Sequence, residues 1–184
     1  MSQTEVEKKT ITLLLVDDDT DLRQDMVAYF QRSGYRVIDC GTATDALSLA
    51  DRQHVDVIIL DMILPDMSGL EVLEKLRSRG CDSEIVMLTG EGSIETAVEA
   101  MKKGAREYQT KPIRLKELER LVEKSYSAGQ LVKENRQLRE VLRHHQRPPQ
   151  IIGESEAMRS VFRLIERTAA SNKPILIQGE SGTG

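Results

Sequence analysis

Carboxylates gather where the first apolar run of the sequence ends. The stretch LLLVDDDTD, Leu13 to Asp21, leads from four apolar residues into four aspartates, and Asp61 follows a second apolar run. Like charges held this close repel one another unless a cation or hydrogen bonds offset the charge. Carboxylate oxygens are hard ligands that suit Mg²⁺ with several retained waters. Asp17, Asp18 and Asp61 are therefore the candidate ligands of a magnesium ion.

Two further side chains would complete a site for phosphoryl chemistry. A carboxylate can act as a nucleophile toward phosphorus and form an aspartyl-phosphate. Phosphoryl transfer depends mainly on positioning and on neutralising charge, which a metal ion, a lysine ammonium and a hydroxyl group can supply. Thr89 ends another apolar run, and Lys111 follows the last one. The pattern predicts that these two side chains join the carboxylates.

Short apolar runs that alternate with helical segments must position these side chains. The predicted strands are Ile11–Val16, Tyr35–Cys40, Val55–Leu60, Glu84–Thr89 and Arg106–Thr110. The predicted helices are Asp21–Gln31, Ala43–Asp51, Leu70–Ser78, Ile94–Lys102 and one that begins near Leu115. Strict alternation predicts a doubly wound α/β domain with a parallel sheet. Ligands of such sheets bind beyond the carboxyl ends of the strands, so the candidate side chains should converge there.

Helix boundaries are indicated by capping residues. Serine and threonine accept backbone hydrogen bonds at helix starts, and glycine tolerates the left-handed backbone that follows many helix ends. The expected start and stop residues are Thr42, Ser68, Ser93, Gly34, Gly80 and Gly104.

After residue 126 the periodicity changes to that of a coiled coil. Leu131, Leu138 and Leu142 fall on a heptad seam that also contains Asn135. An asparagine on the seam favours a parallel two-stranded coil in one register. A chance polar residue on a solvated helix would give the same sequence pattern. The sequence predicts a dimerising linker helix over residues 127–147.

The change of periodicity falls at Ser127, Ala128 and Gly129. Glycine costs about 1 kcal/mol relative to alanine inside a helix. This is where the sequence predicts that the helix bends or releases most easily.

Composition excludes several classes of protein. The chain has 184 residues, enough for one domain and a fragment, and a formal net charge of −4 that gives no basic stripe for nucleic acid. Cys40 and Cys81 lack the spacing of a metal site and are expected to be reduced thiols. No signal peptide and no apolar run of membrane-spanning length is present. We expect a cytoplasmic protein with no membrane contact.

Four ordered motifs carry a resemblance to a known family. VDDD, LDMILPDMSGLE, MLTGEGSIETAVEAMKKGAREY and TKP closely resemble the receiver domains of two-component response regulators, over residues 10–126. The resemblance implies a flavodoxin-like fold with strand order 2-1-3-4-5. It also implies a metal-binding pair, a phospho-acceptor, a switch hydroxyl, a switch aromatic and a phosphate-sensing lysine, which are Asp17 with Asp18, Asp61, Thr89, Tyr108 and Lys111. The family's metal also takes a backbone carbonyl, here that of Ile63, and a cis peptide precedes Pro112.

The last segment, residues 151–184, resembles the opening of the AAA+ ATPase domain of sigma-54-dependent activators. A helix over Glu156–Arg167 and a strand over Pro174–Gln178 are expected there. The glycine half of a P-loop, which cradles phosphates with backbone N–H groups, is supplied by Gly179, Gly182 and Gly184. The lysine that should follow is missing because the sequence stops, so no complete nucleotide site is expected.

Together the resemblances imply a regulatory module and not an enzyme. Asp61 would accept a phosphoryl group from a sensor histidine kinase in a reaction that requires Mg²⁺. A homodimer formed by the receiver domain and the linker helix would control assembly of the ATPase. Contacts with sigma-54 RNA polymerase and DNA would belong to downstream domains.

Two other functions are open to test. A metal-dependent phosphatase of the haloacid dehalogenase type also uses an aspartyl nucleophile after a strand, but its DxDx(T/V) motif conflicts with Asp21. A purely structural coiled-coil dimeriser is the third reading, and it should show no response to Mg²⁺.

Overall fold

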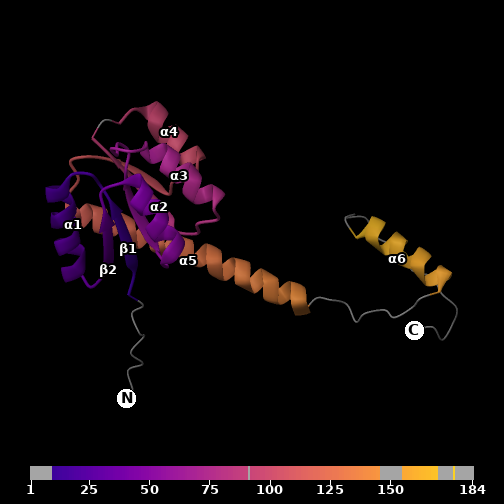
Figure 1. Cartoon of the computed structure of the whole chain (residues 1–184). Coiled ribbons are helices and arrows are strands. Elements are labelled where there is room, and N and C mark those ends of the chain that lie inside the picture. The colour runs from indigo at the N-terminus through magenta and orange to yellow at the C-terminus, as the bar shows by residue number, and fades with distance from the viewer. Residues whose placement is uncertain (1–9, 91, 146–154, 170–175, 177–184) are drawn as a thin grey trace, which may run out of the picture. The chain divides into compact units, whose positions relative to one another are not determined.

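The computed structural model describes residues 10–90, 92–145, 155–169 and 176 (Figure 1). Its contacts divide the chain into two units, Met1–Gln137 and Leu138–Gly184. The predicted strand Pro174–Gln178 lies outside the described residues except for Leu176, which belongs to no regular element. The glycines of the predicted P-loop, Gly179, Gly182 and Gly184, also lie outside them.

Five parallel strands form one sheet in the order β2-β1-β3-β4-β5, which confirms the expected order. The strands are β1 Thr12–Val16, β2 Arg36–Cys40, β3 Val57–Asp61, β4 Glu84–Thr89 and β5 Glu107–Thr110. Every residue of β1 and β3 is buried, while the edge strands β2 and β5 are partly exposed. Strands covered on both faces explain the nearly continuous apolar runs of the sequence.

Five helices connect and follow the strands. They are α1 Thr20–Arg32, α2 Ala43–Arg52, α3 Gly69–Ser78, α4 Ile94–Lys102 and α5 Leu115–His145. The expected caps are confirmed, because Thr42, Ser68 and Ser93 accept backbone N–H bonds at the starts of α2, α3 and α4. The expected stop glycines have positive φ angles, 88° at Gly34, 77° at Gly80 and 99° at Gly104.

A separate hydrophobic core lies on each face of the sheet. Side chains of α1 and α5, such as Phe30 and Val122, pack on one face, and side chains of α2, α3 and α4 pack on the other. Successive strand residues alternate between the cores, as Leu14 and Leu15 do on β1. This double packing fixes the carboxyl ends of β1 and β3 side by side.

Helix α5 continues far beyond its packing on the sheet. Val122 is fully buried, whereas Leu131 and Leu138 are 67% and 63% exposed. The helix runs without a break through the predicted joint at Ser127, Ala128 and Gly129. Gly129 is buried, and a methyl group there would lie 2.6 Å from Oε1 of Glu84. Glycine therefore has a packing role at this position in addition to its low helix propensity.

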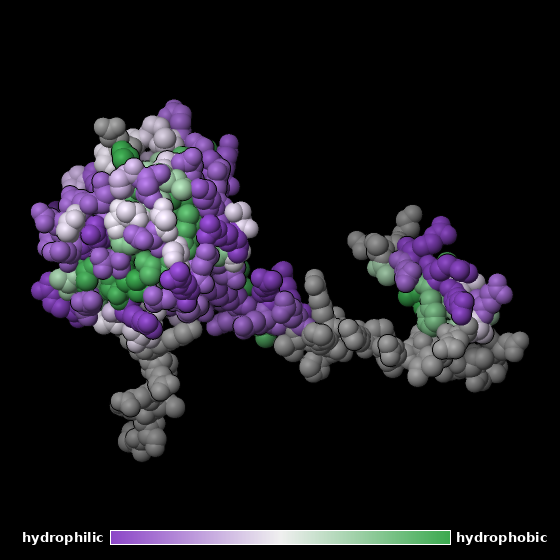
Figure 2. All heavy atoms as spheres, viewed as in Figure 1, coloured by the Kyte–Doolittle hydropathy of each residue, from purple (hydrophilic) through white to green (hydrophobic). Residues whose placement is uncertain are grey.

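The second unit contains the end of α5 and the described helix α6, Glu156–Thr168. Ser155 caps it by accepting a hydrogen bond from the backbone of Met158. Its apolar residues Val161, Leu164 and Ile165 are exposed among the described residues (Figure 2). No described helix combines the length and the apolar character needed to cross a membrane.

Candidate phospho-acceptor site

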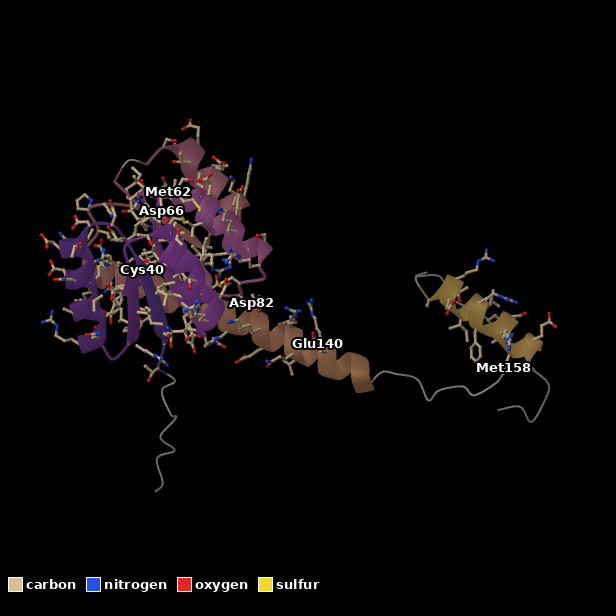
Figure 3. All side chains as sticks on the ribbon, viewed as in Figure 1. Cys40, Met62, Asp66, Asp82, Glu140 and Met158 are labelled. Atoms are coloured by element: carbon tan, nitrogen blue, oxygen red, sulfur yellow. The ribbon has the colours of Figure 1, made fainter. Side chains whose placement is uncertain are left out.

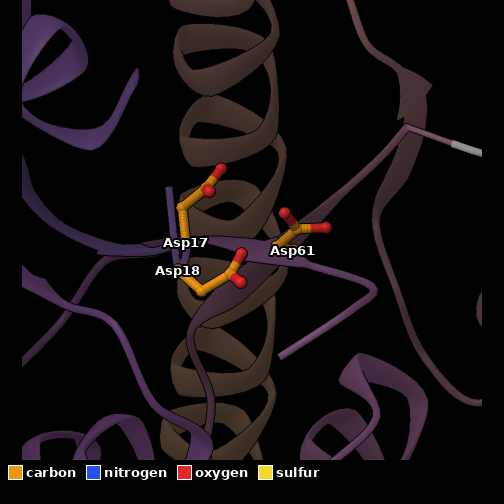
Figure 4. Close-up of side chains that lie close together, drawn as sticks. All are labelled: Asp17, Asp18 and Asp61. Carbon is orange, nitrogen blue, oxygen red and sulfur yellow. The ribbon is translucent and has the colours of Figure 1, made fainter. Parts of the chain in front are cut away.

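Three carboxylates converge at the carboxyl edge of the sheet (Figure 4). Asp17 and Asp18 follow β1, and Asp61 is the last residue of the neighbouring strand β3. One carboxylate oxygen from each residue lies within 4.8 Å of the other two. Asp17 and Asp61 are 1% and 6% exposed, whereas Asp18 is open to solvent. The parallel pairing of β1 and β3 thus brings together residues more than 40 positions apart in the sequence.

Lys111 supplies a positive charge to the same cluster. Its Nζ donates hydrogen bonds to Oδ2 of Asp17 at 2.7 Å and to Oδ2 of Asp61 at 2.5 Å. Burial alone would lower the pKa of Lys111, but the hydrogen bonds and charges of the two aspartates outweigh it and raise the pKa. For Asp17, burial disfavours the charged carboxylate and raises the pKa, although the hydrogen bond from Lys111 opposes this rise. One ammonium faces three carboxylates, so the ionised cluster keeps an excess of negative charge.

This donor set fits a magnesium ion. Mg²⁺ takes oxygen ligands, often from one or two carboxylates together with several waters. The open side at Asp18 leaves room for solvent ligands. The backbone N–H of Ile63 donates to Oδ1 of Asp61 at 3.2 Å, which orients that carboxylate. The carbonyl of Ile63 as a further ligand stays a prediction.

Thr89 and Tyr108 lie on neighbouring strands beside this cluster. Thr89 ends β4 and is fully buried, and Tyr108 of β5 is half-buried. A methyl group on Gly92 would lie 3.3 Å from Cγ2 of Thr89 and 3.4 Å from the hydroxyl of Tyr108. Gly92 of the segment before α4 therefore lies close to both predicted switch residues. The Lys111–Pro112 peptide bond is cis, as the resemblance implies.

The hydroxyl of Tyr108 has a partner that sequence reasoning missed. It lies 2.9 Å from Oγ1 of Thr96, in the first turn of α4. Thr96 is also part of the cap of α4, because its Oγ1 accepts the backbone N–H of Ser93 at 3.1 Å. The only sequence signal for Thr96 is its place three residues after the N-cap.

Asp66, which is labelled in Figure 3, is a second residue that sequence reasoning missed. From the loop between β3 and α3, its carboxylate accepts the backbone N–H groups of Ala43 at 2.8 Å and Thr44 at 2.9 Å. It also accepts the hydroxyl of Thr44 at 2.7 Å. The hydroxyl and the two N–H groups lower the pKa of Asp66 to about 2. Asp66 thus ties the loop that follows Asp61 to the positive end of α2.

Comparison with known families decides the identity of the first unit. The family described as the response regulator receiver domain matches residues 13–123. The chain belongs to the response regulator receiver family. The sigma-54 interaction domain matches residues 151–184, so the receiver domain is followed by the opening of such a domain.

Curated relatives match nearly the whole chain. Regulatory protein AtoC of Escherichia coli is 32% identical over 172 residues, covering 94% of this chain and 37% of AtoC. The C4-dicarboxylate transport transcriptional regulatory protein DctD of Rhizobium meliloti is 29% identical, covering 94% of this chain and 38% of DctD. The chain therefore spans little more than a third of the length of these relatives.

Solved structures agree with the fold. The signal receiver domain of a putative LuxO repressor protein from Vibrio parahaemolyticus superposes with a TM-score of 0.65 at 31% identity, covering 67% of this chain and 95% of that one. NtrX from Brucella abortus gives a TM-score of 0.66 at 27% identity, covering 89% of this chain and 35% of NtrX. The first unit is a regulatory receiver domain of the sigma-54 activator type, and the phosphatase alternative is not favoured.

Proposed function

We propose that Asp61 accepts a phosphoryl group from the phosphohistidine of a sensor histidine kinase in a Mg²⁺-dependent reaction. The observation that carries this proposal is the meeting of three carboxylates and Lys111 at one sheet edge. Lys111 contacts both Asp17 and Asp61, and we assign the acceptor role to Asp61 because it ends the central strand β3.

Each residue of the site would have a separate role in the phosphoryl transfer. A carboxylate oxygen of Asp61 attacks phosphorus, the bond from phosphorus to the histidine nitrogen breaks, and the imidazole leaves with the electron pair. A magnesium ion held by Asp17, Asp18 and Asp61 would offset the charge on the phosphoryl oxygens. Lys111 already lies at hydrogen-bonding distance from Asp61, so its ammonium can hold a phosphoryl oxygen.

The signal would leave the site through Thr89 and Tyr108. The buried hydroxyl of Thr89 is placed at the end of β4, next to β5, where it can bond a phosphoryl oxygen. Gly92, in the loop between β4 and α4, lies next to both side chains, so a shift of Thr89 would change the space available to Tyr108. Movement of α4 and β5 is the proposed output.

Intact-mass measurement tests the chemistry. After treatment with acetyl phosphate and Mg²⁺, the parent chain should gain the mass of one phosphoryl group. Asp61→Asn should gain none, and a chelator should abolish labelling of the parent. Unchanged labelling of Asp61→Asn would assign the acceptor elsewhere, and rapid multiple turnover of a generic phosphate ester would favour the phosphatase.

The exposed seam of α5 supports a homodimer. Leu131, Asn135 and Leu138 are exposed at heptad spacing, and a second copy of the helix would cover them in a parallel coil. Leu142 continues this spacing, but its side chain lies outside the described residues. Residues 10–126 would act as the receiver, 127–147 as the linker and 151–184 as the start of the ATPase domain.

Phosphorylation would act on the ATPase through this dimer. Sedimentation with and without beryllofluoride, together with distances between spin labels at Arg143 of the two copies, tests the link. A monomer in both states, or a separation that ignores beryllofluoride, would contradict it. Contacts with sigma-54 RNA polymerase and DNA are assigned to the further length that the relatives have.

A further inference from the structure

The guanidinium of Arg23 holds the peptide that joins two of the candidate metal ligands. Its Nη1 donates to the backbone carbonyl of Asp17 at 2.5 Å, and this carbonyl belongs to the peptide between Asp17 and Asp18. Its Nε donates to Oδ2 of Asp39 at 3.0 Å, so an ion pair with Asp39 fixes the orientation of the guanidinium. The Arg23 side chain is 15% exposed. One side chain of α1 thus ties the turn after β1 to the neighbouring strand β2.

The guanidinium of Arg23 lies close to the backbone at Gly41. A methyl group on Gly41, directly after β2, would lie 3.1 Å from Nη1 of Arg23 and 3.7 Å from the carbonyl oxygen of Asp17. On the same turn, the backbone N–H of Asp17 donates to the carbonyl of Cys40 at 3.2 Å. The peptide before Asp17 is thus bonded to the end of β2, while the peptide after Asp17 is held by Arg23.

The direction of that peptide decides where two carboxylates point. Asp17 is 1% exposed and Asp18 is open to solvent, yet both carboxylates approach that of Asp61 within 4.8 Å. Consecutive residues of an extended chain point to opposite sides, so their meeting at one point depends on the backbone turn between them. A change in the backbone dihedral angles on either side of this peptide would change the directions of the two carboxylates relative to each other.

We infer that Arg23 is a positioning residue for the metal site, which it serves by fixing the peptide between Asp17 and Asp18. The inference rests on the proposed magnesium site. Arginine suits the task because its planar fork bonds two acceptors in fixed directions, whereas lysine offers a single flexible ammonium. Residues behind metal ligands orient them, and their loss commonly weakens metal binding by about 10-fold to 100-fold.

A purely electrostatic role makes the opposite prediction. A positive charge beside a cation site repels the cation, so removing it would strengthen Mg²⁺ binding. If Arg23 acts by position, Arg23→Met should bind Mg²⁺ more weakly than the parent. Arg23→Lys keeps the positive charge but loses the planar guanidinium. A charge role predicts unchanged Mg²⁺ affinity in this variant, whereas a positioning role predicts weaker binding.

Calorimetric measurement of Mg²⁺ affinity on the full chain is the test. Arg23→Met and Arg23→Lys should each raise the dissociation constant by about tenfold. Asp39→Asn, which removes the ion pair that orients the guanidinium, should raise it by a smaller factor. The matched control is Arg79→Lys, because Arg79 pairs with Asp51 at 2.6 Å on the surface with 45% of its side chain exposed. This control should bind Mg²⁺ as the parent does.

The rate of labelling by acetyl phosphate as a function of Mg²⁺ separates positioning from damage to the fold. In Arg23→Lys the half-maximal Mg²⁺ concentration should rise about tenfold while the rate at saturating Mg²⁺ stays that of the parent. A partly unfolded variant would instead lose the saturating rate. If Arg23→Met does not fold, Arg23→Lys carries the test, because it keeps the positive charge.

Affinity that is unchanged or tighter in Arg23→Lys and Asp39→Asn overturns the inference. Absence of Mg²⁺ binding in the parent chain overturns the proposed function with it. The two failures are therefore distinguishable.

Discussion

Replacing Gly69 by alanine should disturb the backbone of Asp61, the proposed phospho-acceptor. Gly69 is the first residue of α3, and a methyl group there would lie 2.2 Å from the carbonyl oxygen of Asp61 and 2.8 Å from Cα of Met62. Both atoms belong to the main chain and cannot rotate away. The backbone N–H of Gly69 also donates to the carbonyl of Met62 at 2.8 Å, which holds the two segments together. Either α3 or the end of β3 must move by about 1 Å to reach ordinary contact.

The expected loss of stability follows from two opposing effects. Overpacking in a well-packed region costs roughly 1–3 kcal/mol. Replacing glycine by alanine in a helix returns up to about 1 kcal/mol. With the middle of each range, about 2 kcal/mol lost and about 0.5 kcal/mol regained, the free energy of unfolding of Gly69→Ala should fall by roughly 1.5 kcal/mol. Because the same movement displaces Asp61, Mg²⁺ binding should weaken as well.

Urea unfolding followed by circular dichroism measures the effect. Gly90→Ala is the matched control, because a methyl group on Gly90 meets no atom within 4 Å and its backbone has no positive φ angle. That variant should be as stable as the parent or gain up to about 1 kcal/mol. Equal stability of Gly69→Ala and the parent would refute the close contact described here.

Three further changes have defined outcomes. The pKa of Asp66 is lowered to about 2 from 3.8, so its stabilising effect is present above about pH 4 and is lost as pH falls toward 2; Asp66→Asn should lose less stability over that window, as measured by urea unfolding at several pH values. Tyr108→Phe removes only the hydrogen bond to Thr96, whereas Thr96→Val also removes the cap bond from the backbone N–H of Ser93; both should speed amide exchange in the first turn of α4, Thr96→Val more strongly, and the double variant should add little to Thr96→Val. Gly129→Ala should not stabilise the chain despite better helix propensity, because its methyl group meets Glu84; adding Glu84→Ala should recover up to about 1 kcal/mol in urea unfolding.

Much of the fold was predictable because its strands have strong and simple patterns. Strands buried on both faces have nearly continuous apolar sequences, and the predicted and observed bounds of β4 are identical. The meeting of the candidate metal ligands was predictable for a related reason. Asp17 directly follows one such run and Asp61 ends another. Parallel strands place their carboxyl ends at one edge of the sheet.

The supporting contacts were not predictable, because they join elements that are distant in sequence. Arg23 meets Asp39 across 16 positions, and Asp66 meets Ala43 across 23. No local periodicity marks such pairs, since each depends on the final packing of helices on the sheet. Gly129 shows the same limit: its sequence indicates only a weak point in a helix, whereas its burial against Glu84 depends on tertiary structure.

The position of the phosphoryl group on the chain is the most direct test of this account. Peptide mapping by mass spectrometry, after brief treatment of the full chain with acetyl phosphate and Mg²⁺, should find one phosphoryl group on the peptide that contains Asp61. The same treatment without Mg²⁺ should leave that peptide unlabelled. A phosphoryl group found reproducibly on another residue, or labelling of Asp61 that is independent of Mg²⁺, would contradict the account.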